Sequence, residues 1–84
     1  MELLVRQQLI CCFIATFTQE RSYPPTVREV MEWTGCSNVH LAHHHVSELE
    51  RKGYLTRTPR VTRSLRLTEA GKAVARRWKL EGVA

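Results

Sequence analysis

The sequence predicts a mainly α-helical fold with one small β-hairpin: three helices, the hairpin, and then a C-terminal helix. Three observations indicate this fold. Apolar residues recur every three or four positions in separate stretches, helix-start and helix-end residues divide these stretches, and two short strand-like segments flank a turn that contains proline. The chain has 84 residues, so we expect a single domain over residues 1–84, because a second core does not fit this length.

The first helix is predicted over residues 3–19. Its apolar residues return at helical spacing and predict one wall of the core; they are Leu9, Ile10, Phe13, Ile14 and Phe17. Pro24 and Pro25 then end the helical pattern, because consecutive prolines hold the backbone extended.

The second helix is predicted to begin after Thr26, which can form a Thr-x-x-Glu capping box with Glu29. We expect this short helix to bury Val27, Val30 and Trp33. Gly35 suits the left-handed residue that ends a helix, and Ser37 suits the cap of the next one. The pattern is therefore a helix, a tight turn and a helix.

The third helix is predicted from about residue 38 to residue 52, with Gly53 just past its end. A spacing of about 100° per residue predicts a core side formed by Val39, Ala42, Val46 and Leu49. The opposite side holds His40, Leu41, His44 and Glu48.

Residues 54–57 and 64–67 are predicted to be short strands, joined by a turn that contains Pro59. The last helix is predicted from Thr68 onward. Its apolar stripe consists of Ala70, Val74 and Trp78. This stripe either packs beside the first helix or meets another chain.

Charge is divided unevenly along the chain. Residues 1–50 hold three arginines against six glutamates, whereas residues 51–84 hold ten lysines and arginines against two glutamates. A basic half is typical of proteins that bind nucleic acid, although a well-solvated basic tail has the same composition. All eight acidic residues are glutamates, which excludes most Asp-dependent phosphotransfer chemistry. No catalytic set of residues is visible, so we do not expect an enzyme.

The cysteines and the hydropathy predict a cytoplasmic protein with no membrane association. Cys11, Cys12 and Cys36 do not make a paired framework, and we interpret them as reduced core residues. The longest apolar run, residues 9–15, is too short to cross a bilayer, and no leader pattern precedes it.

Three helices with a tight turn between the second and third, followed by a basic hairpin, describe a winged helix-turn-helix. Within this pattern the informative blocks are Arg6-Gln7-Gln8, Tyr23-Pro24-Pro25-Thr26-Val27-Arg28-Glu29-Val30, Gly35, His43-x-His45-Val46, Leu49, Lys52-Gly53-Tyr54 and Arg63-Ser64-Leu65-Arg66-Leu67. In these blocks, and over residues 4–67 without an evident gap, the sequence resembles the DNA-binding domain of the LexA repressors. The resemblance implies a DNA-binding core over residues 1–67 and an added C-terminal helix over residues 68–84.

Two departures from the family pattern matter. LexA repressors continue into a dimerising, self-cleaving serine–lysine peptidase domain, and this chain stops before one begins, so we expect no self-cleavage. After the wing the chain reads Thr68-Glu69-Ala70-Gly71-Lys72, which is similar to the step that follows the wing in MarR-like regulators. One recognition helix and one wing read few base pairs, so we expect a homodimer formed through the C-terminal helix.

Polar side chains near the start of the third helix are the candidates for reading DNA bases. They are Asn38, His40, Leu41, His43 and His44. The resemblance implies base-reading positions for the three histidines, but it does not imply the operator, because LexA's own residues there are different. Leu41 is alternatively a plain exposed leucine, and we interpret His45 as a packed histidine on the core flank.

Hydroxyl and arginine side chains are the candidates for contact with the DNA backbone. They are Thr26, Ser37, Arg57, Arg60, Arg63, Ser64 and Arg66. The arginines concentrate in the hairpin, where a wing meets phosphates. The alternatives are a solvated basic turn for the arginines and simple helix capping for Thr26 and Ser37.

His40 and His44 lie four residues apart on one helix face, with Cys36 nearby in the sequence, and this spacing is one alternative that suggests a metal site. A closed site needs four ligands, and no further pair is positioned to complete one, so we expect no metal and no cofactor.

These observations predict a sequence-specific regulator of transcription that binds double-stranded DNA, most simply a repressor that occludes a promoter, located in the cytoplasm on the nucleoid. The alternative is a winged-helix protein-interaction module, in which Trp33, Trp78 or Leu41 marks the docking surface.

Overall fold

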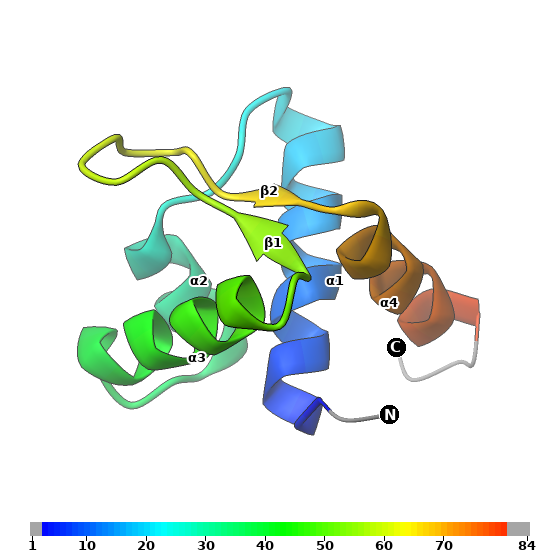
Figure 1. Cartoon of the computed structure of the whole chain (residues 1–84), viewed down its shortest axis with the longest axis horizontal. Coiled ribbons are helices and arrows are strands. Elements are labelled where there is room, and N and C mark those ends of the chain that lie inside the picture. The colour runs from blue at the N-terminus through cyan, green and yellow to red at the C-terminus, as the bar shows by residue number, and fades with distance from the viewer. Residues whose placement is uncertain (1–2, 81–84) are drawn as a thin grey trace.

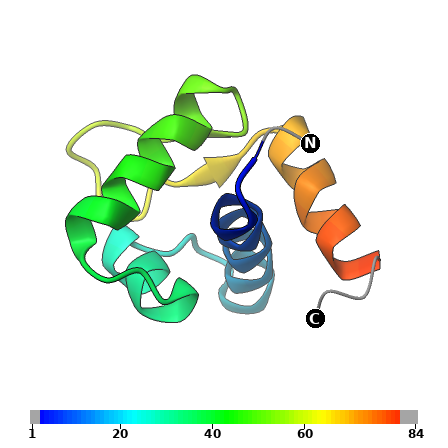
Figure 2. The ribbon, with the colours of Figure 1, turned by 90° about the horizontal axis from the view of Figure 1, so that it is seen from below.

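The computed structural model describes residues 3–80 and shows a mainly helical fold with one small hairpin (Figure 1). The elements are α1 (Val5–Arg21), α2 (Val27–Thr34), α3 (Val39–Arg51), β1 (Leu55–Thr56), β2 (Arg66–Leu67) and α4 (Glu69–Leu80). α1 lies in the middle, with α2 and α3 on one side and α4 on the other, and the hairpin bridges the two sides (Figures 1 and 2). The predicted fold class, a winged helix-turn-helix with a C-terminal helix, is confirmed.

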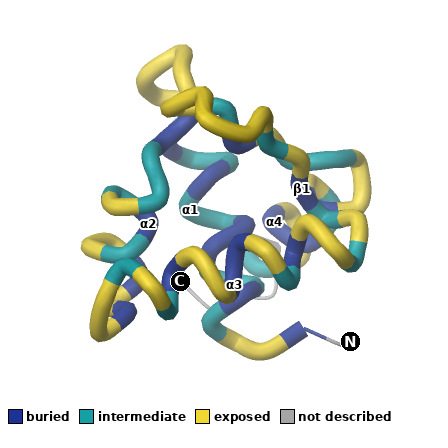
Figure 3. Tube along the Cα trace, turned by 60° about the vertical axis from the view of Figure 1, so that its left-hand side comes forward, coloured by how far each residue is buried: buried dark blue, intermediate teal, exposed yellow. Residues whose placement is uncertain are grey.

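The core lies where α1 meets the other helices and the hairpin. Its buried apolar side chains come from all four helices and the hairpin, and include Ile10, Ile14, Val30, Val46, Leu49, Leu55, Leu65 and Val74. The wing loop and the outer turns of α2 and α3 are exposed (Figure 3). Because α3 and the hairpin share this core, their relative position is set by close packing of buried side chains.

α1 begins and ends two residues later than the sequence predicts. The helix stops at Ser22, whose φ of 66° is left-handed, and the amide of Ser22 donates to Thr18 O at 2.9 Å. Pro24 and Pro25 are both buried and carry the chain to α2.

The predicted start of α2 is confirmed, but the predicted burial of Trp33 is wrong. The capping box is present: Thr26 Oγ1 accepts from the Glu29 amide at 3.1 Å, and the Thr26 amide donates to Glu29 Oε1 at 2.8 Å. Trp33 is 69% exposed, whereas Val30 and Thr34 are buried. The inner face of α2 follows the four-residue step from Val30 to Thr34, and Trp33 therefore lies outside it, stacked on Phe13 with ring centroids 5.8 Å apart.

α3 is capped by Asn38, and the prediction that Ser37 caps it is wrong. Asn38 Oδ1 accepts a hydrogen bond from the Leu41 amide at 2.9 Å, one residue later in the chain than predicted. The core side is as predicted for Ala42, Val46 and Leu49, all 0% exposed, while Val39 is only partly buried. Gly53 has a φ of 87°, as predicted for the residue beyond the helix end.

The hairpin ladder is shorter than the predicted strands. Leu55 pairs with Leu67 and Thr56 pairs with Arg66 in antiparallel register. The intervening wing loop leaves the ladder, with left-handed φ values of 65° at Arg60 and 60° at Arg63.

α4 packs against α1, but not along the whole predicted stripe. Val74 and Ala75 are buried, Trp78 is partly buried, and Ala70 is exposed. Gly71 takes the inner position in the first turn, because α4 approaches the hairpin so closely that a Cβ there would overlap Tyr54 O. Thr68 secures this approach, donating through its amide to Tyr54 O at 3.1 Å.

All three cysteines are free thiols, with Cys11 and Cys36 buried and Cys12 half-buried. Burial raises the pKa of Cys11 to about 12.

Among residues 3–80, no helix is both long enough and apolar enough to span a membrane.

Candidate nucleic-acid interface

α3 presents the three predicted base-reading histidines to solvent near its N-terminal end. His40, His43 and His44 are all exposed, and Leu41 is partly buried. Asn38 is exposed too, but its oxygen caps the helix, so its amide nitrogen is the group that can donate to a base. His40 and His44 lie four residues apart on one face, whereas His43 lies on the side of the helix that faces the wing.

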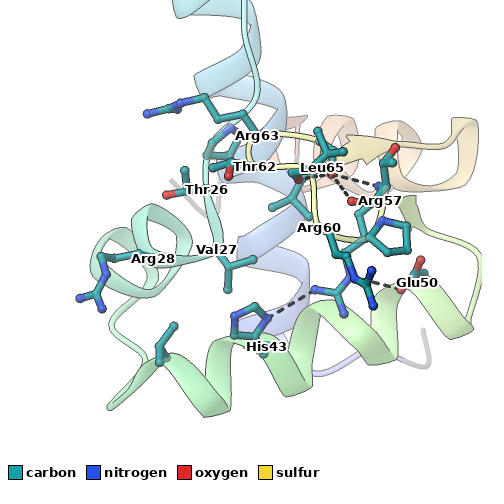
Figure 4. Close-up of a pocket in the computed structure, with 16 residues that line it drawn as sticks. Thr26, Val27, Arg28, His43, Glu50, Arg57, Arg60, Thr62, Arg63 and Leu65 are labelled. Atoms are coloured by element: carbon teal, nitrogen blue, oxygen red, sulfur yellow. Dashed lines mark hydrogen bonds and ion pairs between the residues drawn. The ribbon is translucent and has the colours of Figure 1, made fainter.

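A cleft of about 650 Å³ separates α3 and the start of α2 from the wing loop (Figure 4). Its charged or titratable lining consists of Arg28, His43, Glu50, Arg57, Arg60 and Arg63. The fold therefore brings one predicted base reader, His43, beside three of the predicted wing arginines. Asn38, His40 and His44 do not line the cleft, and Arg66 borders a separate cavity of about 380 Å³ between α1, β2 and α4.

Arg57 at the base of the wing is bound to α3. Its Nη2 donates to Ser47 Oγ at 2.9 Å, its Nη1 lies 3.4 Å from His43 Nδ1, and its Nε lies 3.4 Å from Glu50 Oε1. The contacts to His43 and Glu50 are the dashed lines on either side of the Arg57 guanidinium in Figure 4. One arginine thus connects the wing to three successive turns of α3.

Arg63 fastens the far side of the wing to the start of α2. Its guanidinium donates to both carboxylate oxygens of Glu29, at 2.9 and 3.3 Å, and to Pro24 O at 3.2 Å. Its Cζ also lies 4.8 Å from the centroid of the Tyr23 ring, in cation–π geometry. The Thr26 amide and the Arg63 guanidinium together hold the pKa of Glu29 below its ordinary value.

Ser64 shapes the wing from within. Its hydroxyl accepts from the Thr58 amide at 3.0 Å, and its single proton is shared between the carbonyls of Val61 and Thr58, at 2.9 and 3.1 Å. Arg60 lies in the loop, is exposed, and is one of the residues that line the cleft. Within this loop the Arg57 and Arg63 guanidinium groups bind α3 and α2, whereas Arg60 is exposed and makes no such contact within residues 3–80.

His45 is a packed histidine, as interpreted from the sequence. It is 8% exposed, and its Nδ1 lies 3.3 Å from Nε2 of the buried Gln7. Burial, and then the charges of His44 and Arg6, lower the pKa of His45. Arg6 in turn donates to Thr34 O at 2.7 Å, so the Arg6-Gln7 pair of α1 holds both helices of the helix-turn-helix.

Ser47, Glu50 and Arg28 also belong to this site, although they are not among the residues predicted from the sequence. His43, Ser47 and Glu50 follow one another at four- and three-residue steps, and this helical spacing is the signal that places all three on one face of α3. Arg28 is exposed in the first turn of α2 and points out of the cleft (Figure 4).

The described part of the chain contains no group of three or more His, Cys or Glu side chains able to hold a metal ion. His40 and His44 therefore lack a third ligand within residues 3–80.

A tight turn between the second and third of three helices, an exposed polar face on the third, and a basic wing beside it define the winged helix-turn-helix class of nucleic-acid-binding domains. Residues 1–64 match the family described as "LexA DNA binding domain", so the chain belongs to this family. The resemblance found in the sequence blocks is confirmed.

The LexA repressors of three bacteria are examples of similar proteins. The chain is 42% identical over 62 residues to that of Carboxydothermus hydrogenoformans, 39% over 66 residues to that of Lactiplantibacillus plantarum, and 41% over 66 residues to that of Bacillus mycoides. These matches cover 74%, 79% and 79% of this chain but only 30%, 31% and 32% of the relatives. The matched part of the chain thus spans about a third of the length of each relative.

Proposed function

We propose that this domain binds double-stranded DNA at a specific sequence and represses transcription by occluding a promoter. Its family membership, together with the exposed histidine face of α3 beside a basic wing, carries the proposal. The name of its relatives, LexA repressor, supports the repressing role. The proposed role is binding without catalysis, and we expect it to be exercised in the cytoplasm on the nucleoid, because the proposed target is DNA.

In this proposal the N-terminal half of α3 enters the major groove. His40, His43 and His44 face base edges, where an imidazole hydrogen-bonds guanine N7 or O6. Asn38 offers its amide nitrogen, and Leu41, being partly buried, offers only part of its side chain to a thymine methyl.

The backbone contacts divide between charged and capping groups. Arg60 and Arg66 are exposed on the wing and meet phosphate, or the minor groove in the case of Arg60. Thr26 caps α2 and Ser37 precedes the cap of α3, where first-turn backbone amides are able to donate to a phosphate. Arg57, Arg63 and Ser64 contribute first through the shape of the wing, because their polar groups already bind within the protein.

A second candidate is a protein-interaction module, and one observation favours it. Trp33 is 69% exposed and lies on α2 beside Phe13, on a different surface from the cleft between α3 and the wing. A large exposed indole is a common anchor in protein interfaces. Trp33→Ala is therefore a useful variant in the DNA experiment below, since DNA binding through α3 predicts no change in operator preference.

Assembly of two copies on one operator is part of the proposal. Val74 and Ala75 are already buried in the core, and among the described side chains of α4 the partly buried Trp78 is the large apolar one that remains for a partner. Val83 and the side chain of Leu80, which extend the apolar character of this segment, lie outside the described residues. An operator for such a dimer has half-sites about one helical turn apart, or a multiple of it. Sedimentation on DNA should show two subunits per operator, and a single subunit on an unrepeated site would contradict this assembly.

Selection from a pool of random-sequence duplexes tests the proposed function. We expect one motif to be enriched and the purified motif to bind roughly a thousandfold more tightly than a shuffled duplex of equal length. Trp33→Ala should enrich the same motif. A pool that stays unenriched at low salt, with protein shown to be folded by circular dichroism, would contradict the proposal.

A further inference from the structure

Arg57 forms a three-way contact with α3 that the rest of the wing does not repeat. The side chain is 26% exposed, and its guanidinium meets the hydroxyl of Ser47, the carboxylate of Glu50 and the ring of His43. The positive charge of Arg57 is therefore paired with Glu50 inside the cleft, and all three of its guanidinium nitrogen atoms contact side chains of α3. A side chain held in this way is poorly placed to reach a DNA phosphate.

The contact with His43 dictates which ring nitrogen carries the proton. Arg57 Nη1 lies 3.4 Å from His43 Nδ1, and a guanidinium can donate a hydrogen bond but cannot accept one. Nδ1 of His43 must therefore be the acceptor, which leaves the proton of the neutral imidazole on Nε2. The ring then presents an N–H donor at Nε2, away from Arg57, on the exposed side of α3.

We propose that Arg57 is a positioning residue that holds His43 as a hydrogen-bond donor and thereby sets the base that His43 reads. A donor at Nε2 pairs with the acceptors of guanine, N7 and O6, and is mismatched with the N4 amine that cytosine presents in the major groove. Without Arg57, the imidazole is able to adopt the other tautomer and accept from that amine. This inference rests on the proposed function and assigns Arg57 to specificity, whereas a wing arginine is ordinarily assigned to phosphate.

The tautomer is measured on the free protein by long-range correlation of the imidazole ¹⁵N and ring ¹H signals, at a pH where His43 is neutral. We expect His43 to show a protonated Nε2 and an unprotonated Nδ1 in the wild type, and a mixture of tautomers in Arg57→Ala. Glu50→Gln, which keeps Arg57 but removes its ion-pair partner, should shift the balance in the same direction and by less. Arg60→Ala is the matched control and should leave the tautomer unchanged. A protonated Nδ1 in the wild type, or the same tautomer in the wild type and Arg57→Ala, overturns the inference.

The effect on reading is measured by selecting operators with the wild type, Arg57→Ala, His43→Ala and the double variant. His43→Ala identifies the base pair that His43 reads, because the sequence preference disappears there. At that base pair, Arg57→Ala should reduce the ratio of affinities for guanine over cytosine about tenfold. In the His43→Ala background, Arg57→Ala should cause no further loss of preference, because the two residues act through one hydrogen bond. A purely phosphate-binding Arg57 would instead weaken all sequences equally in both backgrounds.

The selection experiment distinguishes failure of the proposed function from failure of the positioning role of Arg57. A wild-type chain that selects no motif overturns the proposed function and the base-reading role of His43 together. A wild-type motif that survives Arg57→Ala unchanged overturns the positioning role of Arg57 alone.

Discussion

Exposure of a side chain is a poor guide to what it offers DNA. The side chain of Arg63 is 38% exposed, yet its guanidinium binds Glu29 and the carbonyl of Pro24 and covers the ring of Tyr23. Glu29 serves two purposes, because the carboxylate that completes the capping box of α2 also accepts from Arg63. Local hydrogen bonding thus decides which of the wing arginines keep their charge available.

His45 predicts a loss of stability on acidification. Its pKa is lowered from the ordinary 6.5, so between the folded and unfolded pKa values the unfolded chain binds more protons. For His45, the free energy of unfolding therefore has its full value above pH 6.5 and decreases as the pH falls toward the lowered pKa of the folded state. The free energy of unfolding, measured with urea, should decrease between about pH 7 and pH 5, and less steeply in His45→Gln. Equal slopes in the wild type and His45→Gln would contradict the prediction.

The wing is an element held at both ends and braced along its side. Thr68 donates through its hydroxyl to Gly53 O at 2.6 Å and ties the end of β2 to the end of α3. Ser64 closes the loop, Arg57 binds α3, and Arg63 binds α2. The loop can therefore keep one shape although its ladder contains only two residue pairs.

Gly71 allows α4 to leave the wing at a close approach. Gly71→Ala should lower the free energy of unfolding by about 2 kcal/mol or more, because the new Cβ would overlap Tyr54 O, which is backbone and has little freedom to move. Gly53→Ala is the comparison: its Cβ meets open space, so only the left-handed φ of 87° is strained, at a cost of about 1 kcal/mol. Denaturant unfolding measures both, and a larger loss in Gly53→Ala would contradict the argument.

Variants of α3 should change the sequence preference of DNA binding, whereas variants of the wing should change the affinity for all DNA sequences. His40→Ala or His44→Ala should cost about 1 to 3 kcal/mol on the selected operator and little on random DNA, because base edges carry the sequence information. Arg60→Ala should weaken both by a similar factor, because phosphates are alike in every sequence. Electrophoretic titration on the two duplexes measures this. If Arg60→Ala changed the preferred sequence while the histidine variants did not, minor-groove reading by the wing would be the better account.

At the scale of the whole molecule, the candidate DNA-binding elements and the C-terminal helix lie on different sides of α1 (Figures 1 and 2). α3 and the wing loop lie on one side of α1, and α4 covers the other (Figures 1 and 2). The exposed histidines belong to α3. The net charge of +5 comes from the second half of the chain, which contributes the wing and α4. The internal pairing of Arg57 with Glu50 and of Arg63 with Glu29 reduces the charge that the wing presents to DNA.

Binding should depend strongly on salt. If each subunit neutralises about three to five phosphates, the logarithm of the binding constant should fall with the logarithm of the salt concentration with a slope of about −3 to −5 per subunit. Fluorescence anisotropy across a salt series measures this slope. Arg60→Ala should make it shallower by about one, whereas Trp33→Ala should leave it unchanged. An affinity that does not change with salt would contradict an interface built on phosphates.

Local sequence patterns alone determined the order of elements and much of their detail. The capping box of Thr26 and Glu29, the left-handed Gly35 and Gly53, and the buried side of α3 all depend on residues within about four positions of one another, so they are readable without a fold. The family blocks added the winged helix-turn-helix class, which the match over residues 1–64 confirms.

Only the tertiary structure decided which charges are available and which faces are covered. The contacts from Arg57 to α3 and from Arg63 to Glu29 join residues that are up to 34 positions apart in the chain, and no periodicity specifies such pairs. The exposure of Trp33 and the inward position of Gly71 likewise follow from how α2 meets α1 and how α4 meets the hairpin. The physical reason is common to all of these: a hydrogen bond or a close contact is decided by distances of a few ångströms between elements, and those distances exist only once the core has packed.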